Sequence, residues 1–130
     1  MLKLSCEEYF ILQNSKLIAG LAGPMLMALS LSEAINYHIW AINIASVTYL
    51  NGSLLLLAGI SIIRAHNHWM RGWPVIVTLV GWFVSFMGLW RMFFPEARQG
   101  SDISNMYFVF AVLFVMGVFL TYKAYRRDQP

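Results

Sequence analysis

The chain has 130 residues, enough for one domain, and 59% of them are hydrophobic whereas only 12% are charged. Soluble domains carry about a quarter charged residues, so this chain lacks the polar side chains that a water-exposed surface needs. The net charge of +3 does not indicate a nucleic-acid partner, because the cations are scattered at the ends of apolar segments and form no basic stripe. The composition therefore predicts a single-domain integral membrane protein whose main partner is the lipid bilayer.

The first sixteen residues have no clear helical pattern. They mix charges with apolar residues, so a short interfacial or poorly ordered segment is expected before residue 17. Glu7 and Glu8 interrupt the position where the apolar region of a signal peptide would begin, and the first helix is expected to be retained. The single cysteine, Cys6, can form no internal disulfide and provides no metal-ligand spacing.

The rest of the chain divides into four apolar stretches. Between Leu17 and Ile63 the one formally charged residue is Glu33. A continuous helix over this range would be about 70 Å long, more than twice the hydrocarbon thickness, so the chain is expected to turn back in the polar cluster 36–43. Pro74 suits the first turn of the next helix, where a missing N–H is tolerated. The sequence thus predicts an all-α transmembrane bundle with helices at about 17–36, 44–63, 73–94 and 104–122.

The distribution of Lys and Arg predicts the orientation. The N-terminal segment, the loop between the second and third helices and the C-terminal tail together hold seven of the nine Lys and Arg residues. Because cytoplasmic loops are enriched in these residues, both termini are expected in the cytoplasm, with the protein in the inner membrane of a bacterium.

The loop between the second and third helices is expected to lie among lipid headgroups. Trp side chains suit the membrane interface, and arginines meet anionic lipids there. The residues assigned to this role are Arg64, His66, His68, Trp69, Arg71 and Trp73.

The histidines leave two other functions open. His66 and His68 could face the same way in an extended loop, but no nearby Cys, Asp or Glu completes a metal site, so no metal or cofactor is expected. A membrane enzyme or redox subunit that uses His38 or the two loop histidines is an alternative function. Catalysis is the least favoured of the functions considered.

Glu33 and Arg91 indicate a functional site more strongly than the histidines do. An ionisable side chain within a transmembrane helix is costly and normally faces protein or water. With both termini on one side, both residues fall about one turn from the outer ends of their helices, at nearly the same depth. They could mark a site or form a structural ion pair, and either side chain could also extend to the interface on its own.

Stripes of small residues suggest how the helices pack. Ala19, Gly23, Ser30 and Ala34 share one face of the first helix, and Gly81, Ser85 and Gly88 share one face of the third. Such stripes allow close helix contacts in lipid. The fourth helix has few small residues and is expected to face lipid or a neighbouring subunit.

Taken together, these patterns predict a polar pocket in the outer half of the bundle. It would bind or transport a small polar or ionic solute, and four helices offer so little interior volume that a homo-oligomer is expected. The alternative is an accessory or lipid-interacting subunit of a larger membrane complex. The residues assigned to the pocket are Glu33, Asn36, His38, Tyr49, Asn51, Arg91, Asn105 and Tyr107.

Overall fold

The computed structural model of the chain describes residues 5–69, 71–97 and 103–126. All secondary structure in these ranges is helical, which confirms the predicted all-α four-helix fold. Each long helix has the length and apolar composition needed to cross a membrane, as in an integral membrane protein. The elements are α1 (Cys6–Ile35), the short 3-10 helix η1 (Tyr37–Ala41), α2 (Ala45–Ala65), α3 (Pro74–Phe93) and α4 (Ile103–Tyr125).

Helix α1 begins at Cys6, well before the predicted start near residue 17. A capping box starts it: the Ser5 hydroxyl accepts from the Glu8 N–H at 3.3 Å, and the Glu8 carboxylate accepts from the Ser5 N–H at 2.9 Å. The prediction of a poorly ordered segment before residue 17 is therefore wrong from Cys6 onward, whereas an interfacial position for these residues stays a prediction. Those residues form the first turns of a helix of 30 residues, about 45 Å long.

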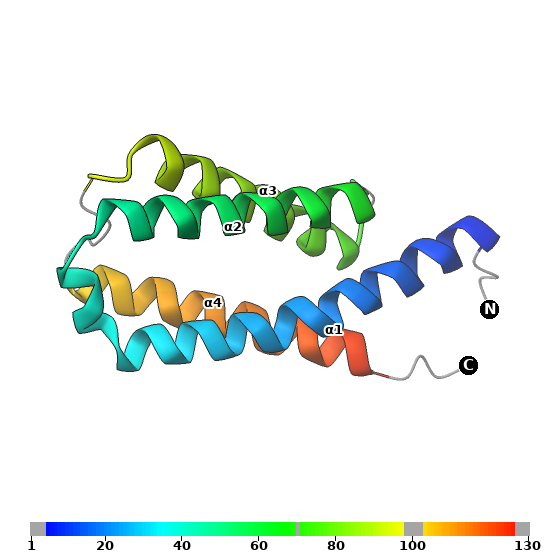
Figure 1. Ribbon diagram of the computed structural model, residues 1–130. Coiled ribbons are helices and arrows are strands. Elements are labelled where there is room, and N and C mark those ends of the chain that lie inside the picture. Colours follow the sequence, from blue (N-terminus) through cyan, green and yellow to red (C-terminus); the bar gives the residue numbers. More distant parts are fainter. Residues whose placement is uncertain (1–4, 70, 98–102, 127–130) are drawn as a thin grey trace.

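The four helices form two layers (Figure 1). Helix α2 packs along α3, and α1 packs along α4, whereas α1 and α3 touch only lightly. The chain runs up and down, so the start of α1, the α2–α3 loop and the end of α4 lie at one end of the bundle, called here the terminal end. The opposite end, called the η1 end, holds η1 and the residues that follow α3. The first turns of α1 extend past the other helices.

The α2/α3 layer is held by direct backbone contact at small residues. A Cβ added to Gly59 would lie 2.5 Å from the backbone nitrogen of Ser85, and one added to Gly88 would lie 2.5 Å from that of Leu56. Both distances are too short for a real side chain. In lipid, where helix association depends on van der Waals packing, such contacts are the main source of attraction between the two helices.

The α1/α4 layer is also held by direct backbone contact at glycines. A Cβ on Gly23 would lie 2.7 Å from the backbone nitrogen of Thr121, and one on Gly117 would lie 2.8 Å from the Gly23 carbonyl oxygen. The fourth helix was expected to face lipid or a neighbouring subunit, and this is wrong for the face that carries Gly117, which packs against α1. One glycine at the crossing point is enough to allow this close contact. The other faces of α4 remain open, with Phe108 71% exposed.

The two layers meet in a small apolar core. Ala19 of α1, Val77 and Val80 of α3 and Leu120 of α4 form one buried cluster. Most other large apolar side chains on the described helices are exposed, as expected for surfaces that face hydrocarbon.

Replacing Gly59 with Ala should weaken the α2/α3 layer, whereas Gly20→Ala should not. The new methyl group at Gly59 would collide with Ser85, but the one at Gly20 would make an ordinary contact of 3.6 Å with the Ala124 Cβ. Overpacking predicts a loss of about 1–3 kcal/mol for Gly59→Ala. Thermal unfolding in detergent, followed by near-UV circular dichroism, compares the two variants. Equal unfolding temperatures would contradict the assigned packing.

Candidate functional site

The structure brings Glu33 and Arg91 together from different layers. Glu33 lies near the end of α1 and Arg91 near the end of α3, so both are at the η1 end. Each side chain is half-buried, and their opposite charges interact. Since α1 and α3 otherwise touch lightly, this attraction is one of the links between the two layers.

Helix α2 supports the stem of Arg91. A Cβ added to Gly52 would lie 2.9 Å from the Arg91 Cβ and 2.8 Å from the Gly88 carbonyl oxygen. Gly52 thus lets α3 approach until the arginine stem lies on the α2 backbone. Asn51 is the preceding residue and is half-buried at the same level. Arg91 is in this way positioned by the close packing of its own layer.

Four further residues of the predicted pocket lie at the η1 end of the bundle. The Asn36 side chain donates to the Ser32 carbonyl at 2.9 Å, which caps the end of α1. His38 is exposed on η1, and Tyr49 of α2 is 50% exposed. Asn105 is also exposed. The binding role assigned to these residues stays a prediction.

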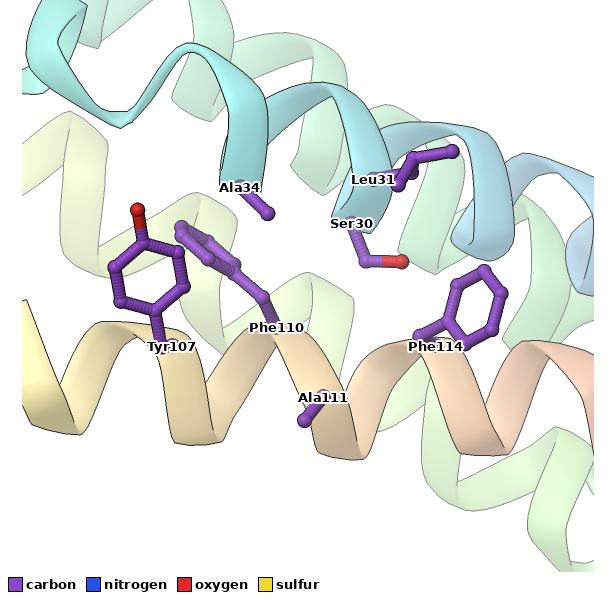
Figure 2. Close-up of a pocket in the computed structure, with 7 residues that line it drawn as sticks. All are labelled: Ser30, Leu31, Ala34, Tyr107, Phe110, Ala111 and Phe114. Atoms are coloured by element: carbon purple, nitrogen blue, oxygen red, sulfur yellow. The ribbon is translucent and has the colours of Figure 1, made fainter.

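Tyr107 has a different neighbourhood from the charged pair. Its ring lies 5.7 Å from that of Tyr37, centroid to centroid, and so links α4 to η1. It also lines a cavity of about 260 Å³ between α1 and α4 (Figure 2). The lining is mainly apolar, and the Ser30 hydroxyl donates to the Leu26 carbonyl of its own helix at 2.7 Å. Its residues are Ser30, Leu31, Ala34, Tyr107, Phe110, Ala111 and Phe114. This cavity is suited to hydrocarbon.

Hydrogen bonds tie the η1 end of the α2/α3 layer together. The Asn43 side-chain amide donates to the Pro95 carbonyl at 3.0 Å, and its oxygen accepts from the Thr48 hydroxyl at 2.8 Å. Asn43 therefore joins the chain before α2 to the chain after α3. Sequence reasoning placed Asn43 in a turn but gave it no partner, because the partner carbonyl is 52 residues away.

In the loop at the terminal end, the position of His66 differs from the one predicted. This side chain was expected among lipid headgroups, but it is 0% exposed. Its Nε2 lies 2.5 Å from the Ser15 Oγ of α1, and its Nδ1 lies 3.0 Å from the Thr78 Oγ1 of α3. Burial lowers the pKa of His66, and the neighbouring charge of His68 lowers it further. His66 is thus a buried junction between the layers.

The other residues of the loop are arranged as a surface segment around this junction. Arg64, Trp69 and Arg71 are exposed, whereas His68 and Trp73 are half-buried. The assignment of these residues to a headgroup region stays a prediction. It no longer includes His66, which is buried.

Two partners of His66 were missed by sequence reasoning. Ser15 precedes Ala19 by one helical turn and continues the predicted small-residue stripe of α1, which is a signal that could have revealed it. Thr78 gave no comparable signal, because it is a single hydroxyl-bearing residue within an apolar stretch. The Asn14 side chain adds a further link, because it donates to the Ala65 carbonyl at 2.6 Å.

Catalysis finds little support at this junction. A serine hydroxyl next to a histidine can act as a nucleophile and base, but both Ser15 and His66 are 0% exposed, so a substrate has no access to them. Among the residues in ranges 5–69, 71–97 and 103–126, no group of three His, Cys, Asp or Glu side chains could hold a metal ion.

Comparison of the chain with protein-family models, with curated proteins and with solved structures finds no match. The case for a function therefore depends on the geometry described above.

Neutralising Glu33 and Arg91 one at a time should destabilise the protein more than neutralising both. In Glu33→Gln or Arg91→Gln, the remaining charge stays half-buried without its opposite, whereas the double variant removes both charges. We expect a coupling free energy of about 0.5–3 kcal/mol, the range for residues that interact with each other.

The measurement is reversible unfolding of the four proteins in one detergent. Glu96→Gln, which alters an exposed carboxylate in the loop after α3, is the control and should have no effect. Additive effects of the two single substitutions would show that the two charges do not stabilise each other.

Proposed function

We propose that the chain is a small polytopic membrane protein that binds or transports a small polar or ionic solute as an oligomer, with Glu33 and Arg91 at the binding site. The observation that carries this proposal is the pairing of a carboxylate and a guanidinium from different layers, both half-buried between apolar helices. An ionisable residue within a membrane-spanning helix is by default a candidate for a solute or ion site.

The arrangement of the layers supports this assignment. Each layer is joined by backbone contact at glycines, but the layers touch each other lightly through α1 and α3. A charged solute can compete for one member of the Glu33–Arg91 pair without disturbing the packing within either layer. A solute that separates the pair would then move one layer relative to the other.

The proposal also covers the orientation of the chain and the membrane in which it lies. The terminal end holds most of the described cations, which favours a cytoplasmic position for this end and for both termini. These cations are Lys16, Arg64, Arg71, Lys123 and Arg126. A bacterial inner membrane suits a chain of this size and charge pattern.

An oligomer is favoured by the exposed surfaces. Phe86 on α3 and Leu57 on α2 are 60% and 65% exposed, and α1 and α4 carry comparable side chains. The cavity between α1 and α4 is mainly apolar, so a polar path across the membrane would need helices from a second copy.

The test is solute binding and flux with purified protein in proteoliposomes, with sodium, chloride and glycine as probes for a cation, an anion and a zwitterion. The wild-type protein and the exposed-site control Glu96→Gln should respond equally to at least one probe. Glu33→Gln and Arg91→Gln should each reduce that response at least tenfold. Unchanged responses in both variants would refute the proposal.

A second candidate is an accessory subunit of a larger membrane complex, which the exposed apolar side chains on all four helices also favour. It predicts that the double variant Glu33→Gln/Arg91→Gln still co-purifies with a membrane partner from native membranes. A homogeneous homo-oligomer without a partner, together with a flux response lost in both single variants, would exclude this function.

A further inference from the structure

His66 and its two hydroxyl partners join α1 to the α2/α3 layer at the terminal end of the bundle. We propose that this junction is a pH-sensitive tie, which holds α1 in place at neutral pH and releases it when His66 takes up a proton. The tie involves neither Glu33 nor Arg91, which lie at the η1 end, and it does not depend on the identity of any solute.

The geometry places one imidazole between two layers. His66 ends α2, Ser15 belongs to α1 and Thr78 belongs to α3, and all three side chains are fully buried. The Ser15 Oγ lies 2.5 Å from Nε2 and the Thr78 Oγ1 lies 3.0 Å from Nδ1. A change at the ring therefore acts on both layers at once.

The hydroxyl groups also have carbonyl partners. The Ser15 hydroxyl donates to the Ile11 carbonyl at 2.7 Å, and the Thr78 hydroxyl donates to the His68 carbonyl at 3.1 Å. Thr78 accepts from the His68 backbone N–H at 3.2 Å as well. Each hydroxyl has one proton, so beside a neutral ring one of the two must turn its proton from the carbonyl to the unprotonated ring nitrogen, while the other accepts the ring N–H. None of these groups supplies a negative charge.

Charged groups of both signs lie at the terminal end, near the tie. On the loop, the His68 ring lies 5.0 Å from that of His66, centroid to centroid, and edge-on to it. The groups that face the tie from α1 and α3 are the side chains of Asn14, Ser15 and Thr78, which are uncharged. The charges at this end belong to Lys16, Arg64, Arg71, Lys123 and Arg126 and to the exposed carboxylates Glu7 and Glu8 in the first turns of α1. A proton on His66 therefore creates a cation in a fully buried site whose direct side-chain partners, Ser15 and Thr78, are neutral.

The direction of the pH effect follows from this environment. Burial, followed by the charge of His68, lowers the pKa of His66 in the closed tie. Once α1 separates and water reaches the ring, the pKa returns to its ordinary value of about 6.5. The closed form is therefore fully favoured above about pH 6.5 and loses stability as the pH falls from there to the lower pKa of the closed form. Within that window one proton changes the open-to-closed ratio up to tenfold per pH unit.

Spin labels at Gln13 on α1 and at Arg71 on the loop report on the tie, because both side chains are exposed and they belong to the two segments that the tie joins. The labels are placed in a Cys6→Ser background, and the distance between them is measured by electron paramagnetic resonance in nanodiscs from pH 8 to pH 4.5. The distance distribution should gain a longer component as the pH falls below about 6.5. The carbon-13 shift of the His66 ring, measured in the unlabelled wild-type protein, should titrate over the same range.

Three variants separate His66 from the other histidines. His66→Gln should remove the pH dependence, whereas His38→Gln, which alters an exposed ring on η1, should keep it. His68→Gln should reduce its amplitude, because the pKa of closed His66 then lies nearer its ordinary value. A wild-type distance that stays constant over this range would overturn the proposal, as would an unchanged transition in His66→Gln. If His66→Gln does not fold, the wild-type titration decides: a ring that titrates without any change in distance would also overturn it.

Discussion

Close backbone contact at glycines is the constraint on which the rest of the structure depends. In lipid, apolar side chains gain little by leaving hydrocarbon for a protein core, so helices associate where their backbones can approach closely. Gly59 and Gly88 provide this approach for α2 and α3, and Gly23 and Gly117 provide it for α1 and α4. The helices are therefore sorted into two tightly packed layers, with only a small apolar core between them.

The contacts between the layers are of another kind. At the η1 end they include the attraction between Glu33 and Arg91, and at the terminal end the buried contacts of His66 with Ser15 and Thr78. Polar interactions are strong in an apolar setting but depend on protonation and on competing ligands. The bundle thus combines two tightly packed layers with polar links between them, and these links are where the proposed solute binding and the proposed pH response would act.

The sequence was sufficient for the features that follow from periodicity and charge. Four apolar stretches of suitable length predicted four helices, and the positions of Glu33 and Arg91 near the ends of their helices placed them at nearly the same depth, without any knowledge of helix pairing. Helix partners were harder to foresee, because a single glycine such as Gly117 decides where α4 crosses α1, and its partner is far away in the chain. His66 was assigned to the surface because its burial depends on Ser15, 51 residues earlier. Long-range contacts of this type leave no local pattern.

The length of α1 has a mechanical consequence. About 14 Å of helix separates Ser15, where α1 meets His66, from Cys6 at its first turn. Because this segment is one continuous helix that extends past its neighbours, it behaves as a rigid lever with its fulcrum at the imidazole. The rest of α1, from Ser15 to Ile35, is about 30 Å long, so a tilt about this point would move the tip about half as far as the opposite end of the helix.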